Sequence, residues 1–112
     1  MTLDEVITVL KIRQHKAKVY TDEAKLIKDV KESLEMLDDC CVIRQEAIHK
    51  IGIPDLTLCY NGRFIAIELK DDEGSPSTLQ VEWLTKIAKA GGIAIVASSV
   101  YPVIEALKRA AL

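Results

Sequence analysis

Residues 53–70 read IPDLTLCYNGRFIAIELK, and this stretch decides the fold of the chain. Asn61-Gly62 lies between two apolar runs, which is the strongest short-range signal for a β-hairpin with a two-residue type I′ turn. Such a turn pairs Tyr60 with Arg63 and thereby sets the partner of every other residue in the two strands. The non-site positions of both strands are apolar on both faces, which predicts central strands covered on two sides.

The same register predicts a charged site at the far end of the hairpin. It places Asp55 directly opposite Glu68, with Cβ atoms about 5 Å apart, where like charges destabilise a sheet. At an effective dielectric of about 20 their repulsion is on the order of 3 kcal/mol, which indicates a bound counter-charge. Because side chains alternate along a strand, Lys70 points the same way as Glu68. Mg²⁺ suits this pair of carboxylates, and a water that the metal activates beside Lys70 is a suitable nucleophile for phosphodiester hydrolysis.

Length and composition predict one domain over residues 1–112. Hydrophobic residues make up 49% and charged residues 29%, as is ordinary for soluble globular proteins. No apolar run approaches the ~20 residues of a membrane span, and the acidic start lacks the basic residues of a signal peptide. Three cysteines without a CxxC spacing argue against a disulfide framework. We therefore expect a cytoplasmic protein with no membrane partner.

The net charge and the distribution of charge along the chain point in opposite directions on whether the protein binds nucleic acid. The net charge of −2 is mildly unfavourable, because Lys and Arg drive binding to the phosphate backbone. However, Lys11, Arg13, Lys16 and Lys18 form a stretch without acids. The simplest interpretation of that stretch alone is a solvated basic connector, and the alternative is a DNA-binding surface.

Hydrophobic spacing and capping signals predict the elements along the chain. A capping box at Thr2 opens a short helix that ends before Ala17, so that residues 1–20 are a helix and a basic connector. Thr21 or Asp22 caps a second helix that runs to about Leu37. Strands at 40–47, 54–60 and 63–70 follow, then a polar loop at 71–77, a helix at 78–90, a strand at 93–97, and a final helix with Pro102 in its first turn. The order α-α-β-β-β-α-β-α predicts an α/β fold with a mixed four-stranded sheet flanked by helices.

Further polar residues have both a structural and a functional interpretation. Glu23 projects from the apolar stripe of the second helix, where it is either an acid favoured by the helix dipole or a third carboxylate of the metal site. Gln80 follows Ser77 at the spacing of a capping box, and it is also placed to orient a water or a phosphate oxygen. His49 and Lys50 lie in the loop before the Asp55 strand, where they are candidates for contact with phosphates.

An ordered set of motifs resembles a known family. Gly52–Asp55, Glu68–Lys70, Ser77–Gln80 and Gly91-Gly92 ahead of a buried strand occur in sequence. Together they resemble the virus-type replication-repair nuclease (VRR-NUC) domain of the PD-(D/E)XK nuclease superfamily. The resemblance covers roughly residues 21–112, and the N-terminal extension departs from it.

The resemblance implies a restriction-endonuclease-like core and a role for each matched residue. Asp55 and Glu68 would ligate Mg²⁺ or Mn²⁺, with the carbonyl of Leu69 completing the protein ligands. Lys70 would orient or deprotonate the attacking water. Glu23 matches the helical glutamate that supports the metal or the water.

The resemblance also implies a substrate and an assembly. Gln80 matches the helical glutamine of the family, and small stand-alone members from phages and bacteria are similar to Holliday-junction resolvases. The implied function is a structure-selective endonuclease, a homodimer on branched DNA in a bacterial or phage-infected cell. Two-fold symmetry would present one site to each strand. The alternative is a non-catalytic nucleic-acid-binding or scaffolding module that keeps the fold.

Overall fold

Helices and strands follow one another in the predicted order α-α-β-β-β-α-β-α. The computed structural model describes residues 1–44 and 52–112. The elements are α1 (Leu3–Ala17), α2 (Glu23–Glu35), β1 (Cys40–Arg44), β2 (Leu56–Tyr60), β3 (Arg63–Leu69), α3 (Thr78–Lys89), β4 (Ile93–Ala97) and α4 (Tyr101–Ala111). In the described residues, no helix is long and apolar enough to cross a membrane.

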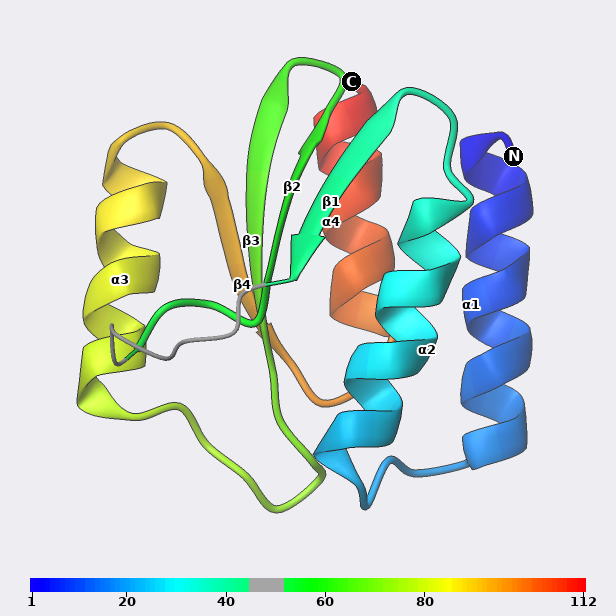
Figure 1. The fold of residues 1–112 in the computed structure, drawn as a ribbon, viewed down its shortest axis with the longest axis horizontal. Helices are drawn as coiled ribbons and strands as arrows, with labels where there is room; N and C mark the ends of the chain where they lie inside the picture. Colours follow the sequence, from blue (N-terminus) through cyan, green and yellow to red (C-terminus); the bar gives the residue numbers. More distant parts are fainter. Residues whose placement is uncertain (45–51) are drawn as a thin grey trace.

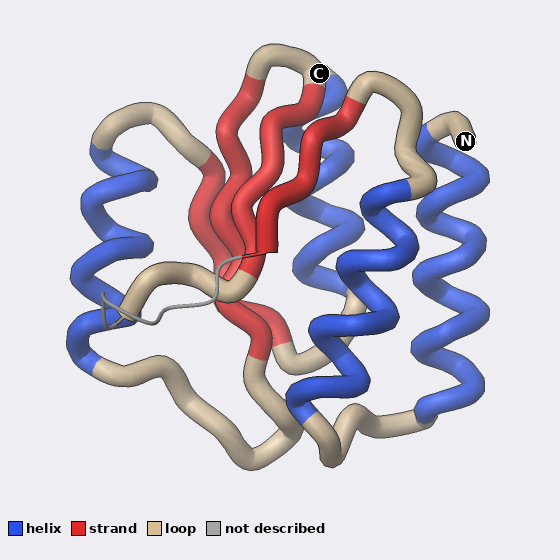
Figure 2. Tube along the Cα trace, viewed as in Figure 1, coloured by secondary structure: helices blue, strands red, loops and turns tan. Residues whose placement is uncertain are grey.

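The sheet is mixed, as predicted, and its strands lie in the order β1-β2-β3-β4. β1 and β3 each run antiparallel to β2, whereas β4 runs parallel to β3. A parallel neighbour requires a crossover connection, which α3 provides. Figures 1 and 2 show the resulting layers, with α3 on one side of the sheet and α1, α2 and α4 on the other.

The turn between β2 and β3 is the predicted two-residue hairpin. Tyr60 pairs with Arg63, and Leu56 pairs with Ile67 at the other end of the ladder. Asn61 and Gly62 have φ values of 51° and 73°, as a type I′ turn requires. The turn is also anchored, because Asn61 Nδ2 donates to the carbonyl oxygen of Ala110 in α4 at 2.8 Å.

The main core lies between the sheet and the layer formed by α1, α2 and α4. One face of the hairpin contributes Leu56, Leu58, Ile65, Ile67 and Leu69, all buried. The prediction that both faces of the hairpin are covered is wrong near the turn, where Cys59 is exposed and Phe64 is 47% exposed. The reason is the position of α3, which packs against β3 and β4.

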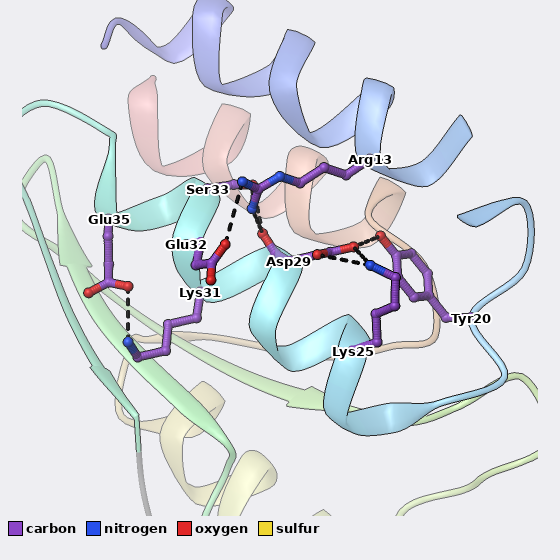
Figure 3. A network of polar contacts seen from close by, with 8 residues as sticks. All are labelled: Arg13, Tyr20, Lys25, Asp29, Lys31, Glu32, Ser33 and Glu35. Atoms are coloured by element: carbon purple, nitrogen blue, oxygen red, sulfur yellow. Dashed lines mark hydrogen bonds and ion pairs between the residues drawn. The ribbon is translucent and has the colours of Figure 1, made fainter. Parts of the chain in front are cut away.

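A polar network fixes α2 against α1 (Figure 3). The guanidinium of Arg13 donates to the backbone oxygen of Asp29 at 2.8 Å and to Ser33 Oγ at 3.1 Å. The Tyr20 hydroxyl donates to Asp29 Oδ2 at 2.8 Å, and Lys25 Nζ lies 3.2 Å from the same oxygen. Burial and this hydrogen bond raise the pKa of Tyr20. The buried charge of Asp29 is thereby paired, which removes most of the penalty of burying it.

Several predicted boundaries move by one to three residues. α1 ends at Ala17, one residue beyond the predicted end. Lys11, Arg13 and Lys16 lie on this helix, so the interpretation of the basic stretch as a connector is wrong for these three residues. α2 ends at Glu35 and not at Leu37, because Met36 and Leu37 bond to carbonyls three residues back instead of four. β1 is described to Arg44, and the rest of its predicted range lies outside the described residues.

Candidate active site

Asp55 and Glu68 hold one another at the end of the β2–β3 hairpin. The β2–β3 ladder ends at the Leu56–Ile67 pair, and continuing its register by one residue places Asp55 opposite Glu68, as the sequence predicts. The backbone N–H of Asp55 donates to Glu68 Oε1 at 3.1 Å. In return, Asp55 Oδ2 accepts from the backbone N–H of Leu69 at 2.8 Å. These two bonds orient both carboxylates before any ligand arrives.

Lys70 and Gln80 complete the surroundings of Glu68. Lys70 Nζ lies 3.4 Å from Glu68 Oε2, and Gln80 Nε2 donates to the same oxygen, at 2.6 Å. The capping box predicted at the start of α3 is present, since Ser77 N–H donates to Gln80 Oε1 at 2.8 Å and Gln80 N–H donates to Ser77 Oγ. One end of the Gln80 amide therefore caps α3 and the other end holds Glu68, whereas orientation of a water or a phosphate oxygen by Gln80 stays a prediction.

Glu68 is strongly destabilised as an anion. Glu68 is fully buried, with 0% of the residue exposed to solvent. Burial and then the charge of Asp55 raise the pKa of Glu68 to about 7, while the Lys70 ammonium acts in the opposite direction. A carboxyl group with such a pKa takes up a proton near neutrality unless another positive charge replaces that proton.

Glu23 reaches the same neighbourhood from the start of α2. Burial raises the pKa of Glu23, the Lys70 ammonium opposes that rise, and the charges of Asp55 and Asp71 add to it. The loop after β3 is tied to the segment before α2, because the Asp72 N–H donates to the Tyr20 carbonyl at 3.0 Å. Figure 1 shows β3 ending beside the start of α2. The structure thus brings Glu23 within electrostatic range of the pair.

The two carboxylates have the donor chemistry that suits a hard divalent cation. Within residues 1–44 and 52–112, no three or more His, Cys, Asp or Glu side chains gather closely enough to hold a metal ion. Asp55, Glu68 and Glu23 thus do not form one three-carboxylate group. A pair of carboxylates with several waters is nevertheless the usual protein contribution to Mg²⁺. Ligation by Asp55, Glu68, Glu23 and the Leu69 carbonyl remains a prediction.

The predicted DNA-binding residues differ in their exposure and in their contacts. Lys11, Lys16 and Lys18 are exposed on and just after α1, which ends at the same end of the molecule as β3 (Figure 1). The guanidinium of Arg13 is instead occupied by α2, with Glu32 a further 3.6 Å partner, so its contacts are structural. His49 and Lys50 lie outside the described residues.

Gly52 fixes the distance between the Asp55 strand and α3. It has a φ of +89°, and a Cβ added there would lie 2.8 Å from the backbone carbon of Leu79. This close approach sets the chain leading into Asp55 against the first turn of α3, next to Gln80. The sequence signal was the glycine three residues before Asp55, but only the structure shows what it contacts.

Gly52→Ala is expected to destabilise the protein by about 1–3 kcal/mol, because it combines a strained φ with a steric clash. Urea unfolding measures the change. Gly91→Ala is the matched control, since Gly91 also has a positive φ, of +100°, but nothing lies within 4 Å of its added Cβ. Equal losses for the two variants would show that packing on Leu79 contributes nothing.

The chain matches no protein-family model and no curated protein. A solved structure titled "VRR_NUC domain" is similar with a TM-score of 0.54 and 23% sequence identity, over 77% of this chain and 89% of that one. The fold is that of a VRR-NUC domain. The mixed four-stranded sheet and its flanking helices are therefore a VRR-NUC arrangement, in which Asp55, Glu68 and Lys70 lie at the end of the hairpin.

Proposed function

We propose that this protein is a metal-dependent endonuclease that hydrolyses phosphodiester bonds in DNA, with a preference for branched structures. The observation that carries the proposal is the convergence of Asp55, Glu68, Lys70 and Gln80 around one buried carboxylate. The likeness to a structure titled "VRR_NUC domain" supports it. In this proposal the cofactor is Mg²⁺ or Mn²⁺, and the active form is a homodimer.

Asp55 and Glu68 would hold the metal. When bound, a divalent cation supplies positive charge to the phosphoryl oxygens and makes a nearby water more acidic. The raised pKa of Glu68 supports this assignment, since a cation beside the pair replaces the proton that Glu68 otherwise takes up. The backbone donors from Asp55 and Leu69 keep the oxygens in place without adding charge.

Lys70 is the residue best placed to act on water. Its side chain lies on the same face of β3 as Glu68, and 16% of it is exposed, so its ammonium is held near the pair yet remains accessible. In the proposed reaction this group orients the attacking water and stabilises negative charge on the phosphate. Gln80 would support that step by positioning Glu68 from the start of α3.

A panel of labelled DNA substrates tests the proposal. Four-way junctions, forks, flaps and plain duplex are incubated with Mg²⁺ or Mn²⁺ and, in parallel, with EDTA. We expect cleavage with either metal, faster on branched substrates, and none in EDTA. Undiminished cleavage in EDTA contradicts metal dependence, whereas tight binding without cleavage of any substrate favours the non-catalytic module.

Lys70→Met is expected to reduce cleavage by about 100-fold, the scale for losing one group that stabilises charge in a transition state. Methionine keeps the apolar stem of the side chain, which packs near Gly74, and removes only the ammonium. Lys108→Met on α4, an exposed lysine paired with Glu105, is the control. Single-turnover cleavage rates of the two variants with Mg²⁺ make the comparison, and equal rates exclude a catalytic part for Lys70.

A further inference from the structure

Two exposed cysteines face each other across neighbouring strands, outside the site described above. Cys41 in β1 pairs with Cys59 in β2, and Cys59 in turn pairs with Phe64 in β3. Both thiols are free and exposed, and Phe64 in the same row is exposed as well. This row lies where the sheet face extends beyond α3, which packs against β3 and β4.

The register gives Cys41 and Cys59 a backbone separation that suits a disulfide. Directly opposed residues of an antiparallel pair have Cα atoms about 4.5–5.5 Å apart, which falls inside the about 4.4–6.8 Å range of disulfides. Alternation along each strand turns both side chains to the same face. We propose that Cys41 and Cys59 form a reversible cross-strand disulfide when the protein meets a peroxide oxidant.

The chemistry balances with hydrogen peroxide as the oxidant. The thiolate of either cysteine attacks the peroxide, giving a sulfenic acid and releasing hydroxide. The thiolate of the other cysteine then attacks that sulfur, forms the S–S bond and displaces the oxygen, which leaves as water. Both cysteines are oxidised by one electron each, and the peroxide is reduced to two waters. A dithiol such as dithiothreitol reverses the bond by exchange.

The third cysteine is placed differently. Cys40 pairs with Tyr60 and packs against the core on the other face of the sheet. Burial raises the pKa of Cys40 to about 11, so its reactive thiolate is scarce at neutral pH. The geometry thus selects one partner for Cys59 out of two cysteines that are adjacent in sequence.

The bond would tie an edge strand of the sheet to its neighbour. It closes residues 41–59 into a loop, and this loop includes Asp55. Such a crosslink removes conformational freedom mainly from the unfolded chain, so the oxidised protein should unfold at a higher temperature. The inference does not depend on the proposed nuclease activity, because Cys41 and Cys59 take no part in the two backbone hydrogen bonds that orient Asp55 and Glu68.

The inference is tested on the folded protein at low concentration. The protein is treated with peroxide, its remaining free thiols are blocked, and its disulfides are located by peptide mass mapping. We expect an intramolecular Cys41–Cys59 disulfide, lost with dithiothreitol, unchanged in Cys40→Ser and absent in Cys41→Ser. The melting temperature should rise by several degrees in oxidised wild type but not in oxidised Cys41→Ser. Cys41 is exposed and Cys40 is half-buried, so Cys41→Ser should fold as wild type does, and circular dichroism checks the fold of both serine variants.

Treatment in denaturant provides the decisive comparison. Without the native register, Cys59 should pair with Cys40 and Cys41 about equally, since they differ by one position in sequence. The same strong preference for Cys41 in denaturant would show that the fold does not select the pair. A Cys40–Cys59 bond, a link between two molecules, or over-oxidation without a disulfide in the native protein would each overturn the inference.

Discussion

Asp55→Asn is expected to lower the rate of metal-dependent DNA cleavage by about 100-fold or more while leaving the fold intact. The asparagine oxygen can still accept the hydrogen bond that Leu69 N–H donates at 2.8 Å, so the loop into β2 keeps its anchor. What disappears is the negative charge beside Glu68. Single-turnover cleavage of a branched substrate with Mg²⁺ measures the effect.

Two controls separate this loss from an indirect one. Glu105→Gln removes a solvent-exposed acid from α4, where Lys108 is its ion-pair partner, and should leave the rate unchanged. DNA binding of Asp55→Asn, measured without metal, should equal that of the wild type or improve slightly, because one negative charge is gone. Robust cleavage by Asp55→Asn would contradict the proposed role of the pair.

Glu68→Gln is expected to abolish cleavage and, in EDTA, to remove a pH dependence of stability. The folded-state pKa of Glu68 lies at about 7, above the ordinary value of 4.5. Between these two values the folded protein binds more protons than the unfolded chain, so the free energy of unfolding falls as pH rises. This destabilisation by Glu68 is absent below pH 4.5, grows as pH rises through 7 and then levels off. Its full size is on the order of 3 kcal/mol.

Urea unfolding in EDTA at a series of pH values from about 5 to 8 measures this difference. Relative to Glu68→Gln, which has no titrating group at position 68, wild type should lose stability across that interval. Subtracting the two curves removes the contribution of Glu23, whose raised pKa acts in the same direction. Parallel curves would mean that Glu68 is not destabilised by burial and by Asp55.

At pH 8 in EDTA, wild type should be less stable toward unfolding than Glu68→Gln, and added Mg²⁺ should reverse this order of stability. A cation that binds the folded carboxylate pair stabilises wild type by mass action, and it replaces the proton because its ligands must be ionised. Glu68→Gln should gain little, since half of the charge at the site is gone. A gain of equal size in both proteins would place the metal elsewhere.

The features that were predicted correctly from the sequence are those that depend on residues adjacent along the chain. The type I′ turn at Asn61-Gly62 and the capping box at Ser77 follow from a few adjacent residues, so both could be predicted and both are present. Helix ends were less predictable. α1 includes Ala17, one residue beyond its predicted end, and Gln14 Nε2 donates to the Lys18 carbonyl just after the helix.

Contacts between distant segments were missed, because no local pattern encodes them. In the sequence Arg13 is one of several basic residues, but in the structure α2 supplies two hydrogen-bond acceptors and one ion-pair partner for its guanidinium. Gln80 reads as a cap, and only the packing of α3 on the sheet shows that its other end holds Glu68. Likewise, the glycine at position 52 contacts Leu79, 27 positions later in the chain.

By itself, the sequence determined that Asp55, Glu68 and Lys70 share one face at the end of one hairpin. That outcome follows from turn geometry and side-chain alternation, which are local and act in any sheet that contains the hairpin. Tertiary structure alone decided which parts of that face are covered. Because α3 lies over β3 and β4, Glu68 is buried and its pKa is raised, while Cys41, Cys59 and Phe64 stay in solvent. The burial of a charge depends on where a remote helix packs, and no spacing within residues 53–70 specifies that.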